Sequence, residues 1–335
     1  FTGISMTARF DVAGLGNAIV DVIARVDDAF LLRHQIAKGG MTLIDAHRAK
    51  MLEDALSETT ITPGGSAANT IAGIASLGAS GAFIGRVHDD WLGEGFAGGT
   101  KSIGVHFDTP FAKEGAPTAR SVILVTPDGQ RSMNTYLGAS VELDEGDIDE
   151  ALIAASKILY IEGYLWDSDS LKGAVRKAIA AARKAGTLVA FTCSDSFCVG
   201  RFRAEFVELI ETEIDIVFAN ESELLALYET EIFDEAFQQA RATGKLFAIT
   251  RSEKGAVVVQ GQAVHLIDAT PGVTVVDTTG AGDQFAAGFL TGVARGLPLG
   301  VSGRLGVLAA GEVISHIGPR PQVLLKDLAA EAGLI

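Results

Sequence analysis

Short apolar runs alternate with amphipathic stretches through the second half of the chain. In the stretch 170–185 (SLKGAVRKAIAAARKA) apolar residues recur every three or four positions, a spacing that predicts a helix. Strands that alternate with helices of this length indicate βαβ units and a mainly parallel sheet covered on both faces. Two earlier runs, 10–16 and 81–87, fit the same sheet. The runs of the second half that predict strands, rich in Ile, Val and Phe, are 157–164, 187–193, 215–219 and 246–250.

Two stretches depart from this alternation, at about 19–47 and 105–138. The first contains VIARV and MTLID, and the second contains HFDTPFA, TARSVILVT and RSMNTYL around a Pro-Asp-Gly turn at 127–129. Period-2 alternation on both sides of such a turn predicts antiparallel strands with a hairpin. We expect a small β-structure inserted in one domain over residues 6–332, forming a lid over a cleft. A peripheral flap with a purely structural role is the alternative.

Composition narrows the possible ligands. The chain has 335 residues, of which 48% are hydrophobic, and 27 basic against 42 acidic residues give a net charge of −15. This charge argues against nucleic-acid or membrane partners, because extended phosphate surfaces are bound by clustered cations. The two cysteines and six histidines form no disulfide framework and no zinc motif. We expect a soluble cytoplasmic protein, a monomer or homodimer, that binds small molecules; residues 1–5, ahead of Met6, are expected to be a remnant of cloning.

The segment DTTGAGD at 277–283 runs directly into a helical pattern at 284–294. Gly280, Ala281 and Gly282 therefore lie where a helix begins, and free N–H groups at the positive end of a helix bind anions. Asp283 falls in the first helical turn, beside this anion site. Such a carboxylate suits a general base that accepts a proton from an attacking hydroxyl. A simple helix cap is the alternative, but the small residues before it favour catalysis.

The run DTTGAGDQFAAGF resembles the C-terminal signature of the ribokinase-like (PfkB-type) family of carbohydrate and nucleoside kinases. Residues 64–70 (GGSAANT) resemble the N-terminal signature of that family, and 85–93 (GRVHDDWLG) resemble its segment after the third strand. The resemblance implies a three-layer α/β/α body with a mainly parallel central sheet and a small β-sheet lid. It also implies an ATP-dependent kinase, in which Asp283 deprotonates the acceptor hydroxyl and the backbone at Gly280–Gly282 holds the transferring phosphoryl group.

The same resemblance implies an acceptor site in the N-terminal part of the chain. A carboxylate and amides can pair with vicinal hydroxyls and reject analogues that lack them. The alternative for Asp21 is a turn residue, and the alternative for Asn69 is a residue at the start of a helix. The run GLGNAI at 14–19 is only a partial dinucleotide fingerprint, so an NAD site is not expected. The acceptor residues implied are Asn17, Asp21, Gly64, Gly65 and Asn69.

A second group of residues resembles the ATP and metal site of the family. Asn220 and Glu223 match an N-x-x-E motif that places Mg²⁺ and phosphate through water, although the same spacing is a helix capping box. A monovalent cation such as K⁺ is a further cofactor that the resemblance allows. No G-x-x-x-x-G-K-[ST] sequence is present, which excludes a P-loop. The remaining nucleotide-site residues implied are Thr250, Ser252 and Gly255, whose alternative is an ordinary hairpin, and Arg131 on the lid, whose alternative is a solvated charge.

Three segments most resemble adenosine kinases and their bacterial relatives: 14–31, 160–168 and 215–227. In such enzymes Phe197 would stack on the adenine, with Leu165 or Trp166 as the opposite wall; a core phenylalanine is the alternative. Met41 departs from the polar residue that some nucleoside kinases carry. We expect phosphorylation of the 5′-hydroxyl of adenosine to AMP. The alternatives are a ribokinase- or fructokinase-type sugar kinase and a non-catalytic nucleoside or sugar sensor.

Overall fold

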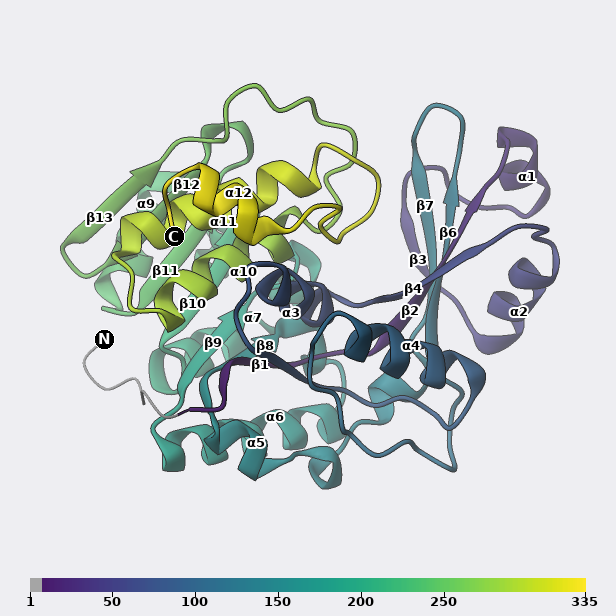
Figure 1. Cartoon of the computed structure of the whole chain (residues 1–335), viewed down its shortest axis with the longest axis horizontal. Coiled ribbons are helices and arrows are strands. Elements are labelled where there is room, and N and C mark those ends of the chain that lie inside the picture. The colour runs from purple at the N-terminus through teal and green to yellow at the C-terminus, as the bar shows by residue number, and fades with distance from the viewer. Residues whose placement is uncertain (1–7) are drawn as a thin grey trace.

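The body of the protein is built on one eight-stranded sheet (Figure 1). The computed structural model describes residues 8–335, so the expectation for residues 1–5 lies outside the described part. The strand order is β13-β12-β11-β10-β9-β8-β1-β5, and all neighbours are parallel except that β12 runs antiparallel to β11 and β13. The strands are β1 (Phe10–Leu15), β5 (Gly81–Ile84), β8 (Ser156–Glu162), β9 (Leu188–Thr192), β10 (Ile216–Asn220), β11 (Leu246–Thr250), β12 (Ala256–Gln260) and β13 (Ala263–Ile267).

Helices cover both faces of this sheet, which confirms the predicted three layers. Successive residues of β8 point to opposite sides, so that Ile158 and Tyr160 join one apolar core and Leu159 and Ile161 join the other. The first core contains α3 (Ser66–Ser76), α4 (Trp91–Ser102), α10 (Ala281–Ala294) and α11 (Leu299–Val313), and α12 (Leu325–Glu331) packs behind them. The second contains α5 (Glu150–Ala154), α6 (Asp169–Ala185), α7 (Ser196–Thr212), α8 (Glu221–Tyr228) and α9 (Phe233–Ala242).

Helix α6 shows how local sequence sets these elements. The side chain of Ser168 accepts a hydrogen bond from the Leu171 N–H at the helix start, and Gly186 ends the helix in the left-handed conformation, with φ of 75°. Both residues flank the amphipathic stretch from which the helix is predicted. Within residues 8–335, four short 3₁₀ helices complete the regular structure: η1 (Gly138–Glu142), η2 (Glu145–Asp147), η3 (Gly163–Trp166) and η4 (Ser252–Lys254).

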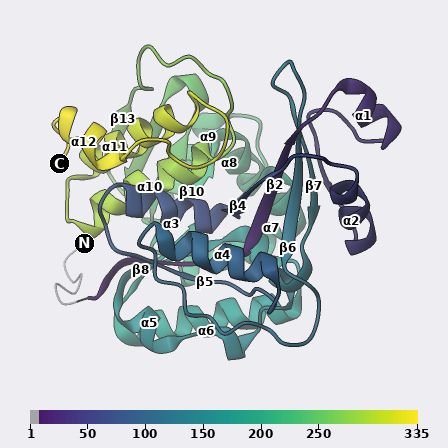
Figure 2. The same ribbon diagram turned by 45° about the vertical axis from the view of Figure 1, so that its right-hand side comes forward.

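A second, five-stranded sheet stands beside the body and is called the lid here, after the role expected for it (Figures 1 and 2). Its order is β3-β7-β6-β2-β4, and β6 and β7 form the antiparallel hairpin that the turn at 127–129 predicts. Ala24 of β2 and the alternate residues Val122 and Leu124 of β6 pack against two helices in a separate small core. The elements are β2 (Ile19–Arg25), α1 (Asp28–Arg33), β3 (Met41–Leu43), α2 (Ala46–Asp54), β4 (Thr60–Gly64), β6 (Ala119–Val125) and β7 (Arg131–Tyr136).

The limits of this lid sheet differ from the expected ranges 19–47 and 105–138. Strand β4 adds residues up to Gly64, whereas the segment 105–118 runs along the body. The His106 N–H donates to the Gly81 carbonyl at 3.0 Å, and the Phe83 N–H donates to the His106 carbonyl at 2.8 Å. Phe107 is buried against Phe83 and Phe96, which fixes the segment HFDTPFA to the body. The pairings β2–β6 and β3–β7 are parallel, not antiparallel as expected.

Candidate active site

The carboxyl ends of the parallel strands bring three of the predicted residues to one edge of the sheet. Asn17 follows β1, Asn220 is the last residue of β10, and Thr250 is the last residue of β11. Ligands of open α/β sheets bind outside these strand ends. The lid sheet approaches the same edge, because β2 follows β1 after three residues. The site is therefore formed by the body and the lid together.

The start of α10 provides an anion site. Gly280 precedes the helix with φ of 80°, and a Cβ there would lie 2.6 Å from the Cα of Pro319, so only glycine fits. The Gln284 N–H makes the first intrahelical bond, to the Gly280 carbonyl at 2.8 Å. The N–H groups of Gly282 and Asp283 consequently have no intrahelical partner and lie at the positive end of the helix. They can hold a negatively charged oxygen.

Asp283 is half-buried beside this anion site. The Ser66 hydroxyl of α3 donates to its Oδ1 at 2.6 Å. Burial raises the pKa of Asp283 to about 6, while the Ser66 hydroxyl, the Asn69 amide and the charge of Arg320 hold the pKa down. The carboxylate is thus mostly ionised at neutral pH and can accept a proton from a hydroxyl.

The candidate acceptor residues lie within contact of one another. A Cβ at Gly64 would be 2.5 Å from Oδ2 of Asp21, and a Cβ at Gly65, whose φ is 92°, would be 2.2 Å from the Asn17 carbonyl. Both glycines therefore allow the β4–α3 connection to touch the Asn17–Asp21 segment. Asp21 is a buried residue of the lid strand β2, not a turn residue. Burial raises its pKa to about 6, and the nearby cations Arg320 and Arg131 oppose this rise.

Three further residues of this cluster are not among the predicted ones: Ser66, Glu162 and Arg320. The buried Glu162 carboxylate ends β8 and accepts the N–H groups of Asn17 and Ala67, each at 2.8 Å. It joins the segment after β1 to the start of α3, and burial raises its pKa to about 7. A glutamate that ends an apolar strand is a signal for such a role. Arg320 lies between two prolines after the last long helix, where no sequence pattern indicates it.

The nucleotide-side residues show the capping geometry directly. Asn220 Oδ1 accepts the Glu223 N–H at 2.9 Å, and the Glu223 carboxylate accepts the Asn220 N–H at 3.0 Å and its side-chain amide at 2.6 Å. Glu223 is buried, and burial raises its pKa to about 7. Both of its oxygens already accept hydrogen bonds, so these residues fit a hydrated Mg²⁺ held through water better than a directly bound ion.

The loop after β11 lies next to this cap. Thr250 pairs in register with Asn220, and Gly255, with φ of 78°, closes a turn in which a Cβ would be 2.0 Å from the Ile267 carbonyl. Ser252 also has a positive φ, of 52°. Arg251 fixes the loop to α8 through Glu221, at 2.8 Å. The hairpin and the nucleotide loop are thus compatible interpretations of one structure.

Arg131 of the lid hairpin forms an ion pair with Asp277, which begins the segment before the anion site. Its side chain is only 7% exposed, which excludes the solvated lid charge. Asp277 also accepts the N–H groups of Thr279 and Gly318. The pair therefore connects the lid to the loop that precedes α10.

Phe197 lies in the first turn of α7 with 83% of its surface exposed, which excludes a core residue. Leu165 and Trp166 are buried, the tryptophan with 2% exposed, so neither supplies the expected opposite wall. Their neighbour Tyr164 is half-buried, and its N–H donates to Ser194 Oγ at 3.3 Å, two residues before the helix of Phe197. An aromatic wall from this segment would come from Tyr164, one residue earlier than predicted.

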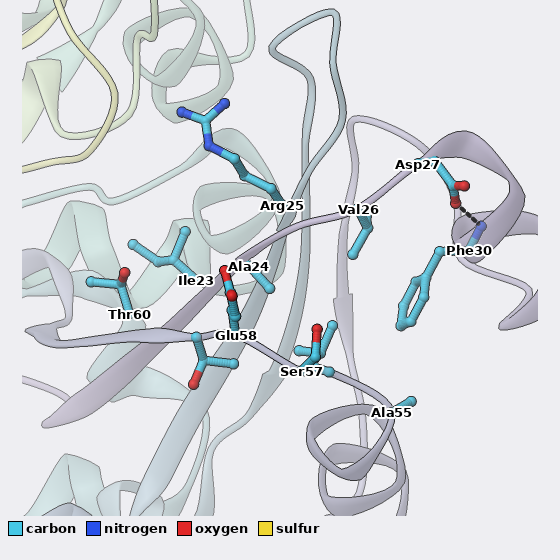
Figure 3. Close-up of a pocket in the computed structure, with 12 residues that line it drawn as sticks. Ile23, Ala24, Arg25, Val26, Asp27, Phe30, Ala55, Ser57, Glu58 and Thr60 are labelled. Atoms are coloured by element: carbon cyan, nitrogen blue, oxygen red, sulfur yellow. Dashed lines mark hydrogen bonds between the residues drawn. The ribbon is translucent and has the colours of Figure 1, made fainter.

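A cavity of about 720 Å³ lies elsewhere, in the lid (Figure 3). Residues of β2, the start of α1 and the segment 55–60 line it, and none of the predicted site residues does. Within residues 8–335 the structure has no helix long and apolar enough to cross a membrane. The same part of the chain has no group of three or more His, Cys, Asp or Glu side chains arranged to bind a metal ion.

Comparison with known proteins decides the family. Residues 33–324 match the model of the pfkB family of carbohydrate kinases. The chain belongs to this family. The match spans the signatures at 64–70 and 277–289, so the family resemblance is confirmed. Kinases of this family are phosphotransferases with an alcohol group as acceptor.

Solved structures and curated proteins place the chain among small-molecule kinases. A probable sugar kinase from Rhizobium etli CFN 42 is 48% identical, with a TM-score of 0.90, and the match covers 98% of this chain and 100% of that one. The adenosine kinase from Sinorhizobium meliloti is 52% identical, with a TM-score of 0.89, over 97% and 100% of the two chains. The probable chloroplastic fructokinase-6 of Arabidopsis thaliana is 31% identical over 71% of this chain, which spans 64% of that protein's length. The predicted fold is confirmed.

Proposed function

We propose that this protein transfers the γ-phosphoryl group of ATP to the 5′-hydroxyl of adenosine, giving ADP and AMP. The observation that carries the proposal is the position of Asp283, beside the free N–H groups at the start of α10 and hydrogen-bonded to Ser66. Asp283 accepts the hydroxyl proton, the hydroxyl oxygen forms a bond to the γ-phosphorus, and the bond to the ADP oxygen breaks. The N–H groups stabilise the charge on the transferring group.

The residues that would bind the acceptor support adenosine as the substrate. Asn17, Asp21 and Asn69 offer a carboxylate and two amides to ribose hydroxyls, and the Asn17 Oδ1 is buried without a hydrogen-bond partner. The exposed ring of Phe197 is free to stack on a base. The 52% identity to an adenosine kinase over nearly the full length supports the same acceptor.

On the nucleotide side, Asn220 and Glu223 would hold Mg²⁺ through water, and Thr250, Ser252 and Gly255 would line the nucleotide loop. The metal, when bound, neutralises phosphate charge during transfer. Arg131 would exchange Asp277 for phosphate oxygens. Replacing K⁺ by Na⁺ in the assay tests whether a monovalent cation is a further cofactor.

A sugar kinase is the second candidate, supported by the 48% identity to a probable sugar kinase and by the fructokinases among the relatives. Carboxylate and amide groups that bind ribose hydroxyls also bind those of a free sugar. The two candidates differ in their use of Phe197. Only a nucleoside presents a flat base to that ring.

The test is ADP release from Mg·ATP with adenosine, inosine, ribose or fructose as acceptor. We expect the highest kcat/KM for adenosine. Phe197→Ala should raise the KM for adenosine about tenfold, on the usual contribution of one base–aromatic contact, and leave the KM for fructose unchanged. A higher kcat/KM with fructose that is insensitive to Phe197→Ala would favour the sugar kinase.

The control for the chemistry is Asp283→Asn, which should lower turnover at least about a hundredfold while adenosine still binds. Unchanged turnover in this variant would refute the role of Asp283. If no acceptor supports ADP release but adenosine raises the melting temperature, the protein is a sensor and not a kinase.

A further inference from the structure

The loop between α11 and α12 reaches the site from the C-terminal end of the chain. The Gly318 N–H donates to Asp277 Oδ2 at 2.9 Å, and the Pro319 carbonyl accepts the side-chain amide of Gln284 at 3.0 Å. The backbone of Pro319 also occupies the space that a side chain at Gly280 would need. Residues Gly318–Arg320, here called the C-terminal loop, therefore contact both ends of the segment that forms the anion site.

The C-terminal loop places the Arg320 side chain among the candidate acceptor residues. Its Nε donates to Asn69 Oδ1 at 2.9 Å. Its charge also interacts with the carboxylates of both Asp21 and Asp283. Burial lowers the pKa of Arg320 to about 10, and the two carboxylates oppose this, so the guanidinium is charged at neutral pH. The charge of Arg320 thus acts on a lid residue and on the proposed base together.

The hydrogen bond from Arg320 determines which way the Asn69 amide points. An arginine only donates, so it must meet the oxygen of the amide. The amino group of Asn69 is then left to act on Asp283, whose pKa it lowers. With the amide reversed, an amino group would face the guanidinium and an oxygen would face the carboxylate, and both contacts would be repulsive.

We propose that Arg320 is a positioning residue for phosphoryl transfer: it holds the Asn69 amide against Asp283 and gives the carboxylates of Asp21 and Asp283 a shared positive partner. This inference rests on the proposed kinase reaction. Two carboxylates in one site disfavour each other's ionisation unless a cation compensates. Asp283 must be ionised to accept the hydroxyl proton, and Asp21 must be ionised to accept ribose hydroxyls, so both tasks depend on Arg320.

The charged groups around Asp21 and Asp283 determine the pH at which these two carboxyl groups titrate. Arg320 acts on both carboxylates, Arg131 of the lid acts on Asp21, and the buried Glu162 interacts with Asp283. Of these, only Arg320 both acts on the two aspartates and donates to Asn69. Its removal should therefore shift the titration of both carboxylates upward.

The experiment compares Arg320→Met and Arg320→Lys with Arg304→Met, an exposed arginine of α11 used as the matched control. We expect Arg320→Met to lower kcat with adenosine by about ten- to a hundredfold and to move the acid limb of kcat/KM to higher pH by about one unit. Arg320→Lys should restore the position of the limb but only part of kcat, because lysine keeps the charge without the fixed fork of donors. The control should change neither.

A double-mutant cycle with Asn69→Ala tests the route through the amide. The loss of kcat from Arg320→Met should be smaller in that background than in the wild type. Additive losses, or an acid limb that stays in place in folded Arg320→Met, would overturn the proposal. If Arg320→Met does not fold, Arg320→Lys provides the test. The acid limb of its kcat/KM profile must stay at the wild-type position while its kcat falls. A wild-type kcat in Arg320→Lys would overturn the proposal.

A second readout separates this proposal from the proposed function. Carbon NMR titration of the Asp21 and Asp283 carboxyls needs no turnover, and both should titrate at higher pH in Arg320→Met than in the wild type. Unmoved titrations would reject the role of Arg320 even in an active enzyme. A wild type without kinase activity, but with shifted titrations, would reject the kinase reaction and retain the electrostatic pairing.

Discussion

The aspartate proposed as the base should lower the stability of the folded protein. The pKa of Asp283 is about 6, raised by burial from an ordinary 3.8. An acid with a higher pKa in the folded state is less stable there when ionised. This contribution is absent below pH 3.8, grows as the pH rises through the interval between the two pKa values, and is complete above pH 6. Replacement by the neutral Asn should therefore stabilise the protein at neutral pH.

The size of this effect follows from the pKa values. A difference of one pKa unit corresponds to about 1.36 kcal/mol, so ionised Asp283 destabilises the fold by at most about 3 kcal/mol at pH 8. Roughly half of this amount develops between pH 5 and pH 8. An unfolding entropy of about 2.1 cal/mol/K per residue gives about 0.7 kcal/mol/K for this chain length. The melting temperature of Asp283→Asn relative to the wild type should thus increase by about 2 °C between pH 5 and pH 8.

Differential scanning calorimetry of both proteins at the two pH values measures this difference. Comparing the pH values removes any constant effect of the new amide on its Ser66 and Asn69 partners, since that effect does not titrate. A matched control is Glu114→Gln at an exposed position, where the melting difference from the wild type should not depend on pH in this interval. If the difference for Asp283→Asn is the same at pH 5 and pH 8, the carboxylate is not buried at a cost, and the reasoning is wrong.

Three further outcomes are expected. In the wild type, kcat/KM should rise as the pH increases through about 6 and level off above it, because Asp283 must lose its proton first; a flat profile from pH 5 to pH 9 contradicts this. Glu162→Gln should lower the urea midpoint by the equivalent of about 1–3 kcal/mol, because the two N–H groups meet separate oxygens of the carboxylate and an amide offers an oxygen to only one of them; an unchanged midpoint would disprove that anchoring. Gly280→Ala should destabilise the protein by about 1–3 kcal/mol through its positive φ and its contact with Pro319. Gly282→Ala should have a much smaller effect on stability, because a Cβ there meets nothing within 4 Å. Equal losses of stability for the two variants would count against the proposed close approach of Pro319 to Gly280.

Much of the fold is predictable because its signals are local. The strands predicted at 215–219 and 246–250 contain the apolar runs IVFA and LFAI, and such runs are buried on both faces of a parallel sheet. The β6–β7 hairpin is predictable from its turn residues. The prediction that places the segment 105–118 in the lid is wrong, because its alternation is compatible with either sheet. Only the packing of Phe107 against Phe83 and Phe96 decides that it follows the body.

The candidate site divides in the same way. Asp283 and its glycines lie within seven residues of one another, so their joint position at a helix start is visible along the chain. Phe197 is exposed, as a stacking residue must be. The predicted wall of Leu165 or Trp166 is not available, since the 3₁₀ turn η3 buries both residues and leaves Tyr164 half-exposed. Ser66 and Glu162 act on residues far away in sequence, through contacts that no spacing reveals.

The sequence by itself determined the family, the order of strands and helices, and the residue types that meet the phosphate, because each depends on neighbours within a few turns of chain. Tertiary structure alone decided the electrostatics of the site. Asp21 and Asp283 are 262 residues apart, and Arg320 joins them from a loop near the C-terminus. Charge interactions depend on distance through space and on burial, and neither is defined until the chain has folded.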